Sequence, residues 1–323
     1  MAKVNSAIGI EYNSREIRAV ELVKDEHGAY KISAYGNERF DKNVISNGLI
    51  MDTSLFGVAV NDLFTKGKFN PDAPIVVGVN NENVIMRYAT FPKVPDDKLR
   101  GVITMQAQDF IPVPVSELGM DFVVIDETTD DDDQPALNVL LIGARNIMLQ
   151  NLIQNFEDSK LEVVDIDSGF LAWCRVAIEE APDGETFGFI KLTDDVLNFV
   201  AIADKEIKMV RSINIPDRAV VEVKKAFNET EEIMDSELDV IADLVYSELS
   251  SSISYFQMQT GYLVNSVLFS AATELEEKLN ELIAAKAYIP VTVPHFNSAF
   301  NTNDFDASKY AGCISLAKVA LEG

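Results

Sequence analysis

Three short stretches near the N-terminus are rich in the β-branched and aromatic residues that favour β-strands. They cover residues 7–12, 17–23 and 30–36. A helix is predicted next, because apolar residues at 55–64 are spaced by three or four and follow the capping residues 52–54. Its apolar face would consist of Leu55, Val58, Ala59, Leu63 and Phe64. Apolar stretches at 75–79 and 84–88 indicate further strands, so the order is β-β-β-α-β.

The same order returns in the second half of the chain, after a predicted linker at 181–185. The strand-like stretches are 187–192, 197–203, 207–213 and 264–269. Before the last of them, a long helix is predicted from Leu238, Ile241, Val245, Leu249, Ile253 and Phe256. Helices at 274–285 and 308–321 and a strand at 289–293 follow. A duplicated β-β-β-α-β-α unit is typical of the actin, Hsp70 and sugar-kinase class, an α/β fold with two ribonuclease H-like domains around a cleft.

The segment between the repeats has a pattern of its own. A predicted helix at 99–110 ends before Pro112 and Pro114, and strands at 121–126 and 138–144 flank four consecutive aspartates. A helix at 147–157, a strand at 161–166 and a helix at 170–178 follow. A calcium loop needs alternating acids, a central glycine and a terminal glutamate, which the aspartates lack. We therefore interpret them as a solvated loop.

Composition narrows the classes of function. The formal net charge of −25 disfavours nucleic acid and anionic lipid as partners. Cys174 and Cys313 have apolar neighbours and are predicted to be reduced, while His27 and His295 have no neighbours that suggest a metal site or a catalytic triad. No apolar stretch reaches the roughly 20 residues that span a bilayer. We expect a cytoplasmic protein without direct membrane insertion.

Four segments resemble the PilM family of type IV pilus assembly proteins. They are QAQDFIPVPVSELGMDFVVID (106–126), VLLIGARNIMLQNLIQNFE (139–157), VVDIDSGFLAWCRV (163–176) and SELSSSISYFQ (247–257). The most specific of them combines Ile-Pro-x-Pro with the Asp-led strand after it. The resemblance implies an actin-like, FtsA-related fold and a cytoplasmic protein held at the inner membrane by the tail of a PilN-like protein, with other pilus assembly proteins as further partners.

The resemblance also implies four subdomains. Subdomain 1A would cover 1–91 and 162–182, the inserted subdomain 1C 92–161, subdomain 2A 183–218 and 264–323, and subdomain 2B 219–263.

In this fold, ATP lies in the cleft, where the backbone N–H groups of two β-turns surround its phosphates. The first turn would lie within EYNSREIR, residues 11–18. Glu11 keeps the acid that holds Mg²⁺ through water, and Ser14 keeps a hydroxyl. Asn13 replaces a glycine but tolerates the left-handed conformation, and Arg18 replaces a lysine. Glu16 adds a negative charge where a triphosphate would lie.

The other two nucleotide sites depart further from the family. The Asp-x-Gly of the second turn is Lys191-Leu192-Thr193 here, followed by Asp194. The Gly-Gly of the third site is Ser270-Ala271-Ala272. A β-branched threonine and added Cβ atoms suit neither a phosphate turn nor a close approach of the nucleoside. We therefore expect a degenerate site without hydrolysis or a cofactor, and at most weak binding of ATP with Mg²⁺.

Two acidic residues outside these turns remain open to two interpretations. Asp167 matches the position near the attacking water, or it caps the helix at 168–178. Glu248 lies on the helix that approaches the ribose in related proteins, or it faces solvent. The complete set of predicted nucleotide-site residues is Glu11, Asn13, Ser14, Arg18, Asp167, Asp194, Glu248 and Ser270.

The resemblance further implies that a PilN-like tail binds a groove between 1A and 1C. The predicted lining residues are Gln106, Phe110, Ile111, Pro112 and Phe122. Gln106 is expected to be the most exposed, and the alternative for the three large apolar residues is the core of 1C. The charge of −25 would attract a tail that carries Lys or Arg.

Three functions compete at this level. The first is a scaffold of pilus assembly, and the second is an ATP-dependent switch with the same fold. The third is an enzyme related to sugar kinases, which needs a glycine-rich phosphate grip that the sequence lacks. A type II secretion adaptor of the GspL kind would carry a membrane helix.

Overall fold

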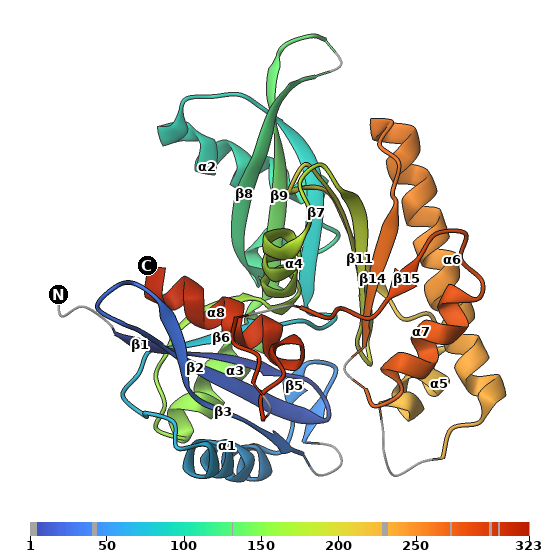
Figure 1. The fold of residues 1–323 in the computed structure, drawn as a ribbon. Helices are drawn as coiled ribbons and strands as arrows, with labels where there is room; N and C mark the ends of the chain where they lie inside the picture. The colour runs from blue at the N-terminus through green and yellow to red at the C-terminus, as the bar shows by residue number, and fades with distance from the viewer. Residues whose placement is uncertain are drawn as a thin grey trace.

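The computed structural model describes residues 5–40, 44–130, 132–227, 232–271, 273–296, 299–302 and 304–322. Two five-stranded sheets of identical topology form the two halves of the molecule, and a three-stranded sheet lies beside both (Figure 1). The duplication predicted from the sequence is therefore confirmed.

The first sheet has the order β10-β6-β1-β2-β3. Its strands are β1 (Ser6–Tyr12), β2 (Glu16–Lys24), β3 (Tyr30–Arg39), β6 (Ile75–Val79) and β10 (Val163–Ser168). The first three form an antiparallel meander, and β6 and β10 add in parallel. Helices α1 (Thr53–Gly67) and α3 (Asn146–Asp158) cover one face, and α4 (Gly169–Glu180) and α8 (Ala311–Glu322) lie on the other. A short hairpin, β4 (Ile45–Ser46) and β5 (Leu49–Ile50), lies near α3.

The second sheet repeats this plan with the order β13-β12-β11-β14-β15. Its strands are β11 (Thr186–Leu192), β12 (Val196–Ala203), β13 (Glu206–Asn214), β14 (Ser266–Ala271) and β15 (Val291–Thr292). Helices α5 (Val220–Ala226), α6 (Asp235–Thr260) and α7 (Glu276–Ala284) pack on one face, and α4 packs on the other. Helix α4 thus contacts both sheets and joins the two halves.

The third sheet has the order β7-β9-β8, with β7 (Val84–Pro92), β8 (Leu118–Thr129) and β9 (Pro135–Arg145), and α2 (Asp96–Gln106) packs beside it. Its limits differ from the predicted insertion 92–161. Strand β7 already pairs with β9, and α3 packs into the core of the first sheet through Met148, Leu152 and Phe156. The insertion as a packing unit therefore extends from β7 to β9.

The predicted apolar face of α1 was partly wrong. Asp52 caps the helix as predicted, with its side chain accepting from the N–H of Leu55 at 2.9 Å. Phe56 and Val60 are buried, whereas Leu55 and Val58 are exposed. The spacing of apolar residues identifies the helix correctly. The buried face differs from the predicted one because Phe56 packs against Phe40 and Phe156.

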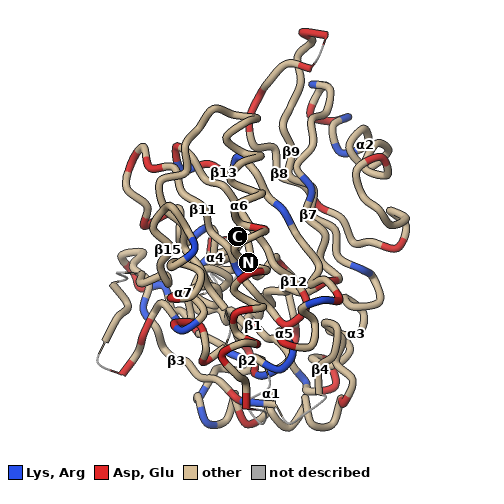
Figure 2. Tube along the Cα trace, turned by 90° about the vertical axis from the view of Figure 1, so that its right-hand side faces the viewer, with Lys and Arg blue, Asp and Glu red and all other residues tan. Residues whose placement is uncertain are grey.

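Several smaller predictions can be compared with the structure. Cys174 and Cys313 are free and buried, as predicted, and burial raises the pKa of both thiols. His27 and His295 are exposed. In the acidic loop, Asp130, Asp132 and Asp133 are exposed at the tip of the β8–β9 hairpin (Figure 2), while Asp131 lies outside the described residues. Among the described residues, no helix has the length and apolar character to cross a bilayer.

Candidate functional site

The hairpins that open the two repeats end in turns that are capped by their own side chains. In the first, Asn13 Oδ1 accepts from the backbone N–H groups of Arg15 at 2.8 Å and Glu16 at 3.0 Å. In the second, the Thr193 hydroxyl accepts from the N–H of Val196 at 3.0 Å. Such Asx and Ser/Thr turns occupy the N–H donors that would otherwise face a phosphate. Neither Asn13 nor Thr193 has a positive φ, so the left-handed conformation considered for Asn13 is not adopted.

The two turns also contact each other across the cleft. The Ser14 hydroxyl donates to the Asp194 carboxylate, and the N–H of Glu82 donates to Asp195 Oδ2 at 3.0 Å. Burial raises the pKa of Asp194, and burial together with the charge of Asp194 raises the pKa of Asp195 to about 7. Two desolvated carboxyl groups at this position disfavour a further anion.

A network around Trp173 fills the space between the turns. The indole Nε1 donates to Glu11 Oε1 at 2.8 Å. The Lys191 ammonium lies 3.9 Å from the centre of the indole ring and donates to Ser270 Oγ at 3.3 Å. Burial lowers the pKa of Lys191, while the negative charges of Glu11 and Glu276 raise it. The ammonium thus lies in the electrostatic field of these two carboxylates, on which Arg18 also acts.

In the third site, between β14 and α7, side chains of the protein also occupy the backbone hydrogen-bonding groups. Glu276 Oε1 accepts from the backbone N–H of Ala271 at 2.6 Å, and the Thr273 hydroxyl donates to the carbonyl of Ala226 at 2.8 Å. Burial raises the pKa of Glu276, while the bond from Ala271 lowers it. Ala272 lies outside the described residues.

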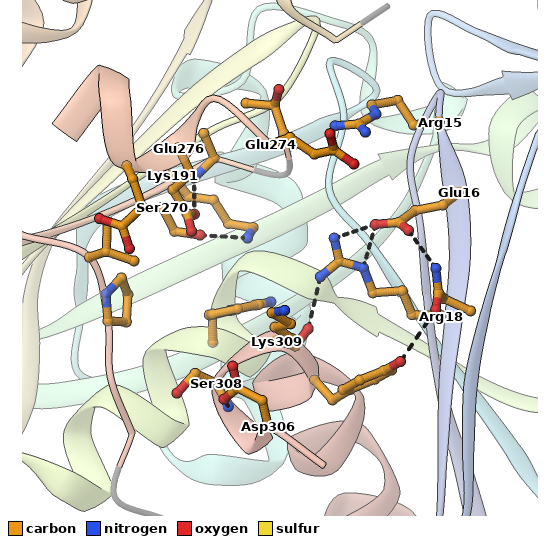
Figure 3. Close-up of a pocket in the computed structure, with 18 of the residues that line it drawn as sticks. Arg15, Glu16, Arg18, Lys191, Ser270, Glu274, Glu276, Asp306, Ser308 and Lys309 are labelled. Carbon is orange, nitrogen blue, oxygen red and sulfur yellow. Dashed lines mark hydrogen bonds and ion pairs between the residues drawn. The ribbon is translucent and has the colours of Figure 1, made fainter. Parts of the chain in front are cut away.

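The described residues line two cavities in this region. One of about 30 Å³ lies directly between the turns, lined by Glu11, Asn13 and Thr193 among others, which is enough for a water molecule. The other, of about 400 Å³, lies beside the network. Figure 3 shows Glu16 and Arg18 on one side of it and Lys191 on the other. Arg18 donates to Glu16 and, at 2.8 Å, to the carbonyl of Lys309.

The structure brings most of the predicted nucleotide-site residues together, but two lie elsewhere. Asp167 pairs with Arg175 at 2.5 Å and lines the β10 side of the sheet instead of either cavity, and the cap of α4 is Ser168, which accepts from Leu171 at 3.2 Å. The helix-cap interpretation of Asp167 was therefore wrong. Glu248 lies 4.0 Å from Arg211 of β13 and does not line either cavity. In the described ranges, no three His, Cys, Asp or Glu side chains form a set of metal ligands.

A separate groove of about 570 Å³ lies between β10 and the third sheet, and we call it the β10 groove. It is lined by Val79, Val84, Arg100, Gly119, Met120, Asp121, Ile142, Ala144, Leu149, Ile153, Val163, Val164, Asp165, Ile166, Asp167 and Ser168. Two of these apolar side chains are accessible, because Val164 is 53% and Ile153 40% exposed. In the described part of the chain, β10 and β8 are outer strands of their sheets.

None of the five residues predicted for a partner groove lines the β10 groove. Ile111 is buried in the core of the third sheet, and Phe122 packs against that core below the guanidinium of Arg100, 5.1 Å from its ring centre. Pro112 and Phe110 are exposed, and both are more accessible than Gln106.

Sequence reasoning missed Trp173, Glu276 and the apolar residues of the β10 groove. Trp173 is the single tryptophan of the chain, which was the available signal for it. The paired valines 163 and 164, adjacent to the acids of the same strand, were a weaker signal for the groove.

Comparison with known proteins agrees with this architecture. The sequence profile of the type IV pilus assembly protein PilM matches residues 9–211. A solved structure described as a PilM–PilN type IV pilus biogenesis complex is 16% identical, with a TM-score of 0.80 over 99% of this chain and 100% of that one. The ethanolamine utilization protein EutJ from Carboxydothermus hydrogenoformans is 11% identical, with a TM-score of 0.52 over 98% of this chain and 90% of that one. The fold is thus the predicted actin-like one, and with more than half of its length matched by the profile, the chain belongs to the PilM family of type IV pilus assembly proteins.

Proposed function

We propose that this protein is a cytoplasmic scaffold of type IV pilus assembly, or of a related pilus or competence system. It docks on the cytoplasmic tail of a PilN-like inner-membrane protein and thereby connects other pilus assembly proteins to the membrane. Membership of the PilM family and the similarity to a chain solved in a PilM–PilN complex support this function. The observation that carries the proposal is the β10 groove.

The β10 groove has the properties of a site for an extended peptide. Such peptides bind through apolar pockets and often beside the outer strand of a sheet. Val164 and Ile153 supply accessible apolar contacts, and β10 supplies the outer strand. Among the charged lining residues, Arg100 pairs with Asp121 at 2.9 Å and Asp167 pairs with Arg175 at 2.5 Å, which leaves Asp165 as the remaining acid of the groove. A tail with Lys or Arg beside its apolar residues fits this surface.

Replacing Val164 by aspartate is expected to weaken tail binding at least about tenfold, because it puts a charge into an apolar contact. The measurement is fluorescence anisotropy with a labelled synthetic peptide of the N-terminal cytoplasmic segment of PilN from the same organism. Raising the salt concentration should weaken binding by the wild-type protein if basic residues of the tail contribute.

The matched control is Val58→Asp. Val58 is 57% exposed, close to the 53% of Val164, but it lies on α1 and does not line the groove. This variant should bind the peptide like the wild type. Equal binding by Val164→Asp and Val58→Asp would contradict the proposed site, and absence of binding by the wild type would contradict the proposed function.

The proposal includes a nucleotide cleft that no longer serves ATP. The N–H donors of both turns are used by Asn13 and Thr193, and that of Ala271 is used by Glu276. A cavity of about 30 Å³ between the turns is far smaller than a triphosphate. Lys191 already supplies the positive charge that Mg²⁺ would bring. These residues therefore do not fit Mg²⁺-ATP.

Calorimetric titration with Mg²⁺-ATP is expected to give no saturable binding up to about 1 mM, where the free energy of binding would be only about −4 kcal/mol. The alternative function is an ATP-dependent switch of the same fold. Saturable binding in the micromolar range that Arg18→Ala abolishes would contradict the proposal and support the switch.

A further inference from the structure

A second groove lies between the insertion and the second repeat. We call it the β7–β13 groove, and its volume is about 1100 Å³. It is lined by Arg87, Tyr88, Ala89, Thr90, Phe110, Asp126, Thr128, Asn138, Lys208, Met209, Val210, Arg211, Ser212, Ile213, Tyr255, Phe256, Gln259, Thr260 and Tyr262. Strands β7 and β13 contact each other here, and both are outer strands of their sheets in the described part of the chain.

Cations outnumber acids among the residues that line this groove, whereas the protein as a whole is acidic. Its charged lining residues are three cations, Arg87, Lys208 and Arg211, and one acid, Asp126. The whole chain carries a formal charge of −25. Asp126 is already bound, because it lies 3.2 Å from the Lys208 ammonium and accepts from Asn138 at 2.7 Å. Lys208 also lies 2.5 Å from Glu206, and Arg211 lies 4.0 Å from Glu248, so Arg87 is the cation of the lining for which the described residues supply no carboxylate.

Of the three cations, Arg87 has the fewest hydrogen-bond and ion-pair partners among the described residues. Its guanidinium donates to the carbonyl of the neighbouring Met86 at 2.8 Å, and no carboxylate pairs with it among the described residues. Burial lowers the pKa of Arg87, and no acid opposes that shift. A half-buried guanidinium has five N–H donors and is costly to leave unpaired. Arg211 has two partners: its guanidinium donates to the Ser252 hydroxyl at 2.8 Å and lies 4.0 Å from the Glu248 carboxylate.

Apolar and aromatic side chains surround these cations. Phe110 is 38%, Tyr255 52% and Tyr262 38% exposed at the groove. Leu263, which follows Tyr262, is 69% exposed, and Met258, three residues after Tyr255, is 78% exposed. Exposed aromatic residues beside arginines are typical of the central contacts of protein interfaces.

We propose that the β7–β13 groove binds an acidic, apolar-containing peptide segment of a partner protein. A carboxylate of that segment accepts bidentate hydrogen bonds from Arg87, and Arg211 attracts a second acid. Its apolar side chains contact Phe110 and Tyr255. This site differs from the β10 groove in position and in charge, so it serves a second partner and leaves the PilN-like tail in place.

A random display library of peptides about 12 residues long tests this assignment. The wild-type protein is expected to enrich peptides that combine Asp or Glu with aromatic or aliphatic residues. Elsewhere the charge of −25 repels such peptides, so their enrichment reports on this groove. The enriched peptides should bind Arg87→Gln at least about tenfold more weakly, since one bidentate charged contact is lost.

The control variants separate this groove from the rest of the protein surface. Arg145→Gln removes a guanidinium that pairs with Glu117 outside the groove. The side chain of Arg145 is 38% exposed, close to the 36% of Arg211. The Arg145→Gln variant should bind the enriched peptides like the wild type. Val164→Asp should also keep these peptides, whatever its effect on the PilN tail. Thermal unfolding of Arg87→Gln verifies that the variant is folded.

Four results would overturn the proposal. The first is a lack of acidic peptides among those enriched, and the second is equal binding of the peptides by Arg87→Gln and the wild type. The third is displacement of the peptides by inorganic phosphate at equal concentration. The fourth is a wild-type protein that sediments with the mass of a dimer, while Arg87→Gln sediments as a monomer. The third would indicate a site for small anions, and the fourth would assign the groove to a second copy of this chain.

Discussion

Replacing Lys191 by aspartate is expected to lower the free energy of unfolding by about 3–5 kcal/mol, the usual loss when a buried charge loses its partner. The ammonium lies over Trp173 between the charges of Glu11 and Glu276. In the variant, three carboxyl groups would lie close together, with Arg18 as the remaining cation that acts on Glu11 and Glu276. Water screens their mutual repulsion only in part, because the aspartate would lie where Lys191 is 6% exposed.

The measurement is urea denaturation followed by circular dichroism, with and without Mg²⁺. Mg²⁺ should stabilise Lys191→Asp more than the wild type, because only the variant lacks a cation at this position. Lys191→Met removes the charge but keeps the packing and should lie between the two. Lys205→Asp, at an exposed pair with Asp183, should change stability little. A Lys191→Asp protein as stable as the wild type in the absence of Mg²⁺ would refute this role of the ammonium.

Gly9→Ala is expected to cost at least about 3 kcal/mol of unfolding free energy, at the upper end of what overpacking does. A Cβ on Gly9 would lie 1.9 Å from the carbonyl oxygen of Cys313 and 2.8 Å from the nitrogen of Ala317. Both atoms belong to the backbone of α8, so a side-chain rotation does not relieve the contact. Helix α8 would have to move off β1, and with it Gly312, which packs against Glu11.

The control variant for this prediction is expected to raise the free energy of unfolding instead of lowering it. Gly101 lies within α2, and a Cβ there would meet no atom within 4 Å. Gly101→Ala should therefore stabilise the protein by up to about 1 kcal/mol through helix propensity. Both variants can be compared by urea denaturation, and a Gly9→Ala protein with an unchanged midpoint would contradict the close packing of β1 and α8.

The sequence predicted the repeated topology and the altered turns because both depend on neighbouring residues. Strands β1 to β3 and β11 to β13 have strong local patterns joined by short turns, so their order could be read directly. The substitutions at Lys191 and Thr193 were visible as departures from a short motif. The buried face of α1 was less predictable, since Phe56 and Leu55 are equally apolar and only the packing partners of Phe56 decide between them.

The partner surfaces could not be predicted in the same way. Phe110 and Ile111 are adjacent in sequence, yet one lines the β7–β13 groove and the other lies in the core of the third sheet. The β10 groove combines residues of β10 with residues of α3 and the third sheet. Its shape depends on how the insertion packs on the first repeat, which no local pattern specifies.

By itself, the sequence determined that this chain has two repeats of one fold, a strongly acidic surface and three turns unlike those of its family. Only the tertiary structure decided what those turns do instead. Glu11, Trp173 and Lys191 come from three separate segments, and they meet because α4 contacts both sheets. Likewise, the sequence shows Arg87 only as one residue of a predicted strand. It becomes a candidate binding residue because the fold half-buries its side chain, and no carboxylate of the described residues pairs with it.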